Sequence, residues 1–413
     1  MTPSSILMLM IGILAAEFVI ERVLSYLNSK NRKKKIPTEL EGIYDDEKYR
    51  KSQEYQAEVE RFSQITSTFS FVLVILLLTT GGFGMIDDWL RGVAAYNPIR
   101  TLMFFGVIFV ASDILNTPFQ LYSTFVIEEK YGFNKTTLGT FFLDKVKGYL
   151  LGGILGGLIL GVLIFLVMQF GSGFWIYFWI VITIFMLFMN MFYTSLILPL
   201  FNKLVPLESG SLKEAIEAYS QKVNFPLKNI FVIDGSKRSA KANAFFSGLG
   251  KKKKIVLYDT LIENHSEDEL VAVLAHEAGH FKKKHIIYSM IMGVLQTGLT
   301  LYILSLMINS SEVSWAMGGQ TTALHLNILA FGILYSPIST IMGVLGNIYS
   351  RKNEYEADEY AVTTYAKEPL QTALKKLTSD NLSNLQPHPW YVFVHYSHPT
   401  LLQRLRAMDA IAL

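Results

Sequence analysis

Two histidines and a glutamate stand at a spacing that could hold and use a metal ion. They lie in VAVLAHEAGHFKKKHIIYSMIMGVL, residues 271 to 295, where His276 and His280 are four residues apart. On a helix this spacing puts both side chains on one face, so both imidazoles can reach a single ion. Glu277 lies beside them, close enough to take a proton from an attacking water. The motif therefore predicts hydrolytic metal chemistry.

A third ligand is expected in YSRKNEYEADEYA, residues 349 to 361. Glu354 and Asp358 are four residues apart and share a helical face, whereas Glu356 is rotated by roughly 200° from Glu354. We therefore predict Glu354 as the ligand and Asp358 as the group that orients a ligand histidine. Two imidazoles and one carboxylate with an open fourth position suit zinc, so one Zn²⁺ per chain is predicted.

Five further histidines are interpreted as structural or interfacial, and all but His285, which follows the lysine run at the membrane edge, lack ligand spacing to this pair. They are His265, His285, His325, His388 and His395.

The metal motif runs directly into an apolar segment, and the composition indicates a membrane protein. Of the 413 residues, 51% are hydrophobic, and the mean hydropathy is +0.32, too apolar for an ordinary soluble enzyme. The absence of cysteine excludes disulfides, thiolate zinc sites and cysteine nucleophiles. The net charge of +3 is small and localised, so the lipid bilayer is an expected partner and nucleic acid is not.

Seven apolar runs reach the roughly 20 residues that a membrane-spanning helix requires. They are approximately 5–27, 65–86, 101–127, 149–170, 174–201, 286–308 and 324–349. The fourth run holds two rows of glycines four residues apart, which predict close helix packing in lipid. These rows are Gly148, Gly152 and Gly156, and Gly153, Gly157 and Gly161.

The distribution of positive charge predicts the orientation. The loop after the first span carries nine Lys and Arg residues, whereas residues 309–323 carry none. Because positive loops stay in the cytoplasm, the N-terminus is expected outside and both large polar segments inside. The membrane would be the endoplasmic reticulum in a eukaryote and the cytoplasmic membrane in a bacterium.

Four regions are expected along the chain. Helices one to five occupy 1–201, a zinc domain with the metal helix 202–285, helices six and seven 286–349, and the rest of the zinc domain 350–413. Within the second region, IFVID and KIVLYD have the β-branched and aromatic content of strands. Ser266 is the expected N-cap of the metal helix.

Several motifs together resemble the type I CAAX prenyl protease family of integral-membrane zinc endopeptidases. These are HEAGH, SRKNEYEAD, EEKYGFNKTT at 128–137, SKRSAKANAFFSG and YSHPTLLQRL at 396–405. The resemblance covers nearly the whole chain. It implies a mainly α membrane protein with seven transmembrane helices around a chamber, and a small α/β zinc protease domain of gluzincin type.

The same resemblance implies the three zinc ligands predicted above and assigns Glu277 as general base and then acid. It adds three residues of the catalytic region. Asn243 would hold the substrate or order the site, His398 would hydrogen-bond the developing oxyanion, and Arg404 would support that region.

The predicted activity is hydrolysis of peptide bonds near the C-terminus of CAAX-type or other membrane-associated proteins, prenylated or not. The oligomeric state is left open. One alternative is a membrane quality-control protease of the HtpX type, which has fewer spans. A less favoured one is a seven-span transporter or receptor with a structural metal, which would not need Glu277.

Overall fold

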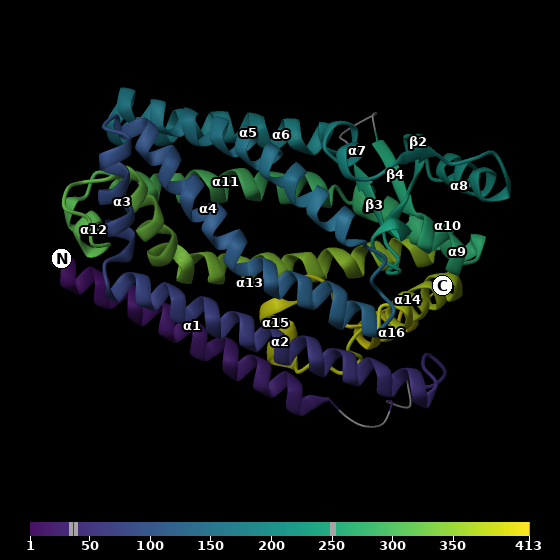
Figure 1. The fold of residues 1–413 in the computed structure, drawn as a ribbon. Helices are drawn as coiled ribbons and strands as arrows, with labels where there is room; N and C mark the ends of the chain where they lie inside the picture. The colour runs from purple at the N-terminus through teal and green to yellow at the C-terminus, as the bar shows by residue number, and fades with distance from the viewer. Residues whose placement is uncertain (33–35, 37–39, 248–252, 413) are drawn as a thin grey trace.

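The protein is an elongated bundle of long helices with a small mixed α/β domain at one end (Figure 1). The computed structural model describes residues 1–32, 36, 40–247 and 253–412. The long helices within these ranges are α1 (Pro3–Asn31), α2 (Asp46–Thr79), α4 (Asn97–Tyr122), α5 (Leu138–Phe170), α6 (Phe174–Leu196), α11 (His285–Met307) and α13 (Leu324–Thr364).

Six helical segments of the described chain are long and apolar enough to cross a membrane, and the longest, Leu138–Phe201, has 64 residues. A straight helix of that length would measure roughly 96 Å, about three times the bilayer core. Gly171, with φ of 52°, ends α5, and the short turn η3 (Gly171–Gly173) leads into α6. Phe170 of α5 stacks on Tyr177 of α6 at 4.1 Å between ring centroids. The segment is thus a hairpin of two helices, which gives the seven expected spans.

The end of the bundle away from the domain holds two short helices, α3 (Gly82–Val93) and α12 (Ser311–Ala316) (Figure 1). Asp87 of α3 is fully buried there. Its carboxylate lies 2.9 Å from His325 Nε2 of α13 and 3.2 Å from Arg100 Nε of α4. This buried cluster ties three helices together.

The glycine rows of α5 do not support close helix packing. A Cβ at Gly148, Gly153 or Gly156 would meet no atom within 4 Å, and one at Gly152 would only touch the Phe109 ring at 3.8 Å. The packing interpretation was therefore wrong, because this face of α5 lies beside open space. The enclosed chamber itself stays a prediction.

The small domain is built on a four-stranded sheet. Its strands are β1 (Leu204–Pro206), β2 (Leu227–Ile233), β3 (Ala244–Ser247) and β4 (Lys253–Tyr258). Their order is β1-β2-β4-β3, with β2 and β4 parallel and both outer pairs antiparallel. The expected strands correspond to β2 and β4. β1 and β3 are the two edges.

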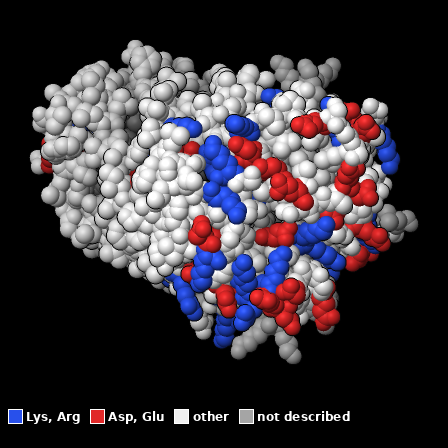
Figure 2. Space-filling view, turned by 45° about the vertical axis from the view of Figure 1, so that its right-hand side comes forward, with Lys and Arg blue, Asp and Glu red and all other residues white. Residues whose placement is uncertain are grey.

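Six helices complete this end of the protein. They are α8 (Ser211–Lys222), α9 (Asp259–Asn264), α10 (Glu267–Lys282), α14 (Lys367–Asp380), α15 (Pro389–His395) and α16 (Leu401–Asp409). One hydrophobic core joins all of them except α15, and it includes Leu40, Ile216, Leu274, Leu370 and Leu405. Charged side chains gather over this end, whereas the white surface further from it carries few (Figure 2).

Helix α10 begins as the sequence predicts. The Ser266 hydroxyl accepts a hydrogen bond from the Glu269 backbone N–H, and the Glu269 side chain accepts one from the Ser266 N–H. This capping box satisfies two N–H groups that a helix start leaves without partners. It fixes the start of α10, and therefore the phase of the two histidines about three and four turns later.

The closest approach of α10 and α13 occurs at Gly279. A Cβ on Gly279 would lie 2.9 Å from Ala357 Cα and 3.0 Å from Ala357 O. These are backbone atoms of a long helix and cannot move individually. Only glycine therefore allows the two helices to approach this closely.

We predict that Gly279→Ala lowers the melting temperature of the detergent-solubilised protein, because the new methyl overpacks the contact at a cost of about 1–3 kcal/mol. Gly343→Ala in α13 is the control, since a Cβ there meets no atom within 4 Å and alanine favours helix. Equal melting temperatures for the two variants would show that the contact is not tight.

Candidate active site

Three potential metal ligands converge where α10 packs against α13. His276 and His280 come from α10 and Glu354 from α13, and their donor atoms all lie within 4.8 Å of one another. The two Nε2 atoms are 3.2 Å apart. Glu354 Oε2 is 3.5 Å from His276 Nε2, and Glu354 Oε1 is 3.3 Å from His280 Nε2.

These separations suit a tetrahedral zinc ion. Zinc–ligand bonds of about 2.0–2.1 Å place the ligand atoms of a tetrahedron about 3.3–3.4 Å apart. In addition, Glu354 Oε2 is buried and accepts no hydrogen bond, although a buried carboxylate oxygen normally has a partner. A cation between the three side chains would supply that partner.

A buried ion pair between Asp358 and Arg404 holds the His276 ring on its Nδ1 side. His276 Nδ1 is 2.9 Å from Asp358 Oδ1, so Nδ1 carries the proton and Nε2 faces the site with its lone pair. Arg404 of α16 donates to both Asp358 oxygens, at 2.8 and 2.6 Å, and its Nη1 lies 3.4 Å from Glu354 Oε2. Arg404 thus lies behind the ligands and contacts two carboxylates of the site, those of Asp358 and Glu354.

A second chain of contacts holds His280, and the sequence did not indicate it. His280 Nδ1 lies 3.0 Å from His285 Nδ1, and His285 Nε2 lies 3.1 Å from Glu356 Oε2. If His280 donates from Nδ1, His285 accepts there and donates to Glu356, which leaves His280 Nε2 free to face the metal position. Lys284 has a left-handed φ of 61°. It lies between the end of α10 and the start of α11, and this turn brings His285 against His280.

Glu277 and His398 border the same space. Glu277 is half-buried on α10, and its negative charge acts on His280 and Arg404. His398 Nε2 is 3.3 Å from Glu354 Oε1, and its side chain is 61% exposed. Ser397 Oγ lies 2.9 Å from His398 Nδ1. A hydroxyl donating to Nδ1 leaves an Nε2–H that can donate to a substrate.

Asn243 lies at the start of the edge strand β3. Its side chain is exposed and its Oδ1 accepts from the Ala244 N–H at 2.9 Å, while its carbonyl accepts from the Tyr258 N–H at 3.1 Å. Among the described residues, the hydrogen bonds of Asn243 reach none of the converging ligands. The structure therefore places it on the sheet edge rather than in the metal cluster.

Neighbouring carboxylates favour the charged forms of both Arg404 and His280. Burial lowers the pKa of Arg404, but the carboxylates of Asp358, Glu354 and Glu277 outweigh it, and the net pKa is raised. Burial also lowers the pKa of His280, but the hydrogen bond with Glu354 and the charges of Glu277 and Glu354 outweigh it and raise the pKa. Arg404 therefore stays charged, whereas a metal ion must displace protons from His280.

Comparison with known proteins agrees with this geometry. Residues 25–203 match the family model described as CAAX prenyl protease N-terminal, five membrane helices, and residues 206–412 match that of peptidase family M48. The chain belongs to peptidase family M48. It is thus a multi-pass membrane metallopeptidase, and the resemblance seen in the sequence is confirmed.

M48 relatives match along almost the whole length. The CAAX prenyl protease 1 homolog of Oryza sativa subsp. japonica is 37% identical over 91% of this chain and 90% of its own. The CAAX prenyl protease 1 of Saccharomyces cerevisiae is 33% identical over 97% and 94%. The crystal structure of S. mikatae Ste24p superposes with a TM-score of 0.93 at 32% identity, covering 98% of this chain and 99% of that one.

We predict that Glu354→Gln weakens zinc binding by at least about 100-fold, because it removes a charged ligand, whereas Glu356→Gln weakens it by about tenfold, the lower end of the range for outer contacts. Glu356 reaches the site only through His285 and His280, so it is the matched control. Zinc affinity measured by competition with a chromogenic chelator separates the two variants. Similar losses in both would mean that the helical phase of the third ligand is misassigned.

Proposed function

We propose that this M48 peptidase uses zinc to cleave peptide bonds near the C-terminus of prenylated CAAX proteins. The observation that carries the proposal is the convergence of two imidazoles and a carboxylate at the spacing of a zinc tetrahedron. These ligands lie just beyond the span carried by α13, beside the membrane where a lipid-anchored substrate would be held. The rice and yeast relatives are named for CAAX processing, which supports the substrate class.

In the proposed reaction, His276, His280 and Glu354 hold the metal. Bound zinc polarises the scissile carbonyl and lowers the pKa of water to about 7. Glu277 accepts a proton from the attacking water and then returns it to the leaving amine. His398 donates its Nε2–H to the oxygen on which negative charge develops. Arg404 and Asp358 act as positioning residues, because their contacts reach the ligands.

The edge strand β3 offers a place for the substrate backbone. Within the described residues β3 pairs only with β4, so its other edge can receive an extended peptide. Asn243, exposed at the start of this edge, would bind a backbone amide of the substrate. This pairing would present the scissile bond in an extended conformation.

The alternative substrate class is that of a quality-control protease. Chelator-sensitive cleavage of a farnesylated CAAX peptide, with little cleavage of the same peptide without its lipid, would favour the CAAX proposal. Equal cleavage of both, together with cleavage of unfolded membrane proteins, would favour the HtpX-type activity.

We predict that Glu277→Gln retains zinc, since all three ligands remain, yet lowers kcat by a factor of at least about 100 through loss of the general base. The measurements are zinc content and cleavage of the farnesylated peptide. Glu263→Gln, at an exposed position of α9, serves as the control and should behave as wild type. Near-normal, chelator-sensitive turnover in Glu277→Gln would exclude this base.

We also propose that the metal site faces the cytoplasm, because the loop after α1 is rich in Lys and Arg whereas residues 309–323 have none. Single cysteines at the exposed positions Ser209 and Thr322 test this in a chain with no native cysteine. Thr322→Cys should react with an impermeant thiol reagent added to the non-cytoplasmic side of the membrane, and Ser209→Cys only after permeabilisation. The opposite pattern would reverse the proposed topology.

A further inference from the structure

A groove lined by four lysines lies where α5 and α6 meet the small domain. Lys147, Lys203, Lys237 and Lys254 line a cavity of about 670 Å³, and no acidic residue of the described ranges lines it with them. Its walls come from α5, the end of α6, the short helix α7 (Leu198–Phe201) and the strands β1, β2 and β4. β1 is the sheet edge opposite β3.

The position of this groove along the bundle axis corresponds to the level of a membrane surface. The 23 residue steps from Lys147 to Phe170 on α5, and the 21 from Phe174 to Ser195 on α6, each span roughly 32–35 Å at 1.5 Å per residue. That length matches the roughly 30 Å hydrocarbon core of a bilayer. If the turn between α5 and α6 lies at one membrane surface, Lys147 and Ser195 lie at the other, at the level of the lipid headgroups.

The four ammonium groups have no carboxylate partner within the described chain. Lys147 Nζ donates to Leu200 O at 2.8 Å, and Lys254 Nζ donates to Ser195 Oγ at 2.9 Å. Each ammonium carries three donors, so both retain further donors for a ligand. The side chains of Lys203 and Lys237 are exposed.

Two carboxylates lie near the groove. Asp144 receives two hydrogen bonds from Arg238, at 2.8 and 2.9 Å, and the guanidinium neutralises it. Asp234 accepts from the Lys203 backbone N–H at 2.8 Å and from Asn202 Nδ2 at 2.9 Å, which are neutral donors, so Asp234 keeps its charge. One carboxylate does not balance four ammonium groups, so the groove attracts an anion.

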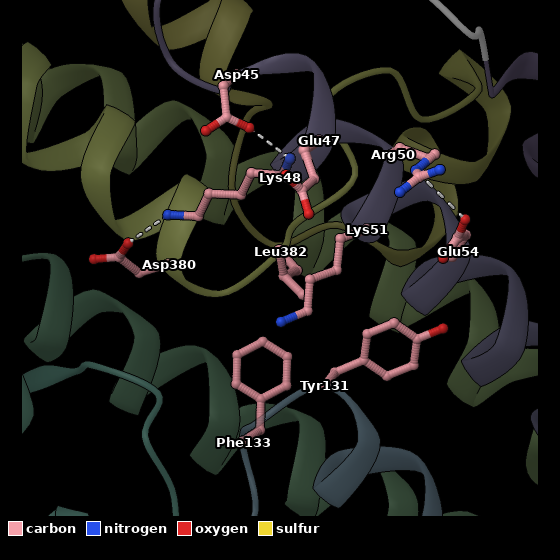
Figure 3. A pocket seen from close by; sticks show the side chains of 10 residues that line it. All are labelled: Asp45, Glu47, Lys48, Arg50, Lys51, Glu54, Tyr131, Phe133, Asp380 and Leu382. Atoms are coloured by element: carbon pink, nitrogen blue, oxygen red, sulfur yellow. Dashed lines mark hydrogen bonds and ion pairs between the residues drawn. The ribbon is translucent and has the colours of Figure 1, made fainter.

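Another cavity of the domain shows the contrast. About 460 Å³ in size, it is also lined by basic residues, but acids line it with them. Lys48 pairs with Asp380 at 3.0 Å, and Arg50 approaches Glu54 at 3.9 Å (Figure 3). Positive charge in that cavity is balanced by the protein itself, whereas in the lysine groove it is not.

We propose that the lysine groove binds the phosphate headgroup of an anionic phospholipid. The phosphate would sit among the lysines, and the acyl chains would follow the apolar surface beside it, where Leu196, Leu200 and Val205 are about half exposed. The cavity has the size of a small-molecule site, and basic pockets beside transmembrane helices suit acidic lipid headgroups. The apolar wall favours a lipid over free phosphate.

The test is a native mass spectrometry titration of the full-length, zinc-loaded protein in a neutral detergent with dioctanoyl phosphatidic acid. Each lysine near an anionic lipid contributes about fivefold in affinity. Lys203→Gln/Lys237→Gln should therefore bind the lipid about 25-fold more weakly, and each single variant about fivefold. Arg50→Gln/Lys51→Gln removes the same charge from the balanced cavity and should bind as wild type does.

Two further arms identify the ligand. Dioctanoyl phosphatidylcholine should bind much more weakly, and inorganic phosphate at the same concentration should not displace the bound lipid. Equal weakening in both double variants, or equal affinity for phosphatidylcholine, would overturn the site. Displacement by inorganic phosphate would show that the groove takes free phosphate, and would overturn the lipid assignment. Unchanged zinc content and melting temperature verify that the variants are folded.

Discussion

The packing of α10 against α13 at Gly279 and Ala357 is the contact on which the metal centre depends. It brings a histidine pair from one helix to a glutamate 74 residues further along the chain, with donor atoms about as far apart as zinc ligands. The two helices are also fixed at their ends, α10 by its capping box and α13 by the span that precedes Glu354. A small change in their separation would move all three ligands.

Around this contact, hydrogen bonds decide which nitrogen of each histidine is available. Asp358 with Arg404 holds one imidazole, and His285 with Glu356 holds the other. Both arrangements place a proton on Nδ1 and turn Nε2 towards Glu354. Such outer contacts commonly change metal affinity by about 10–100-fold, so the neighbours of the ligands are as much a part of the site as the ligands themselves.

Much of this could be predicted from spacing, and the failures have physical causes. The intervals between His276 and His280 and between Glu354 and Asp358 identify shared helical faces, and the apolar runs identify the seven spans. His285 was missed because the backbone reverses at Lys284, where helical periodicity no longer applies. β1 was missed because three residues ending in proline are too few to show a strand pattern. The packing prediction from the glycines of α5 was wrong because small residues allow close helix packing only where a second helix lies against them.

Helix α13 is continuous from Leu324 to Thr364 and measures roughly 60 Å, about twice the bilayer core. One continuous helix therefore begins at the far membrane surface and passes the proposed metal site. Pro337 within it removes one backbone hydrogen bond and creates a point of bending. A change in membrane thickness alters the tilt of such a helix, and a change in tilt would move Glu354. The thickness of the bilayer would thus influence the position of a proposed metal ligand.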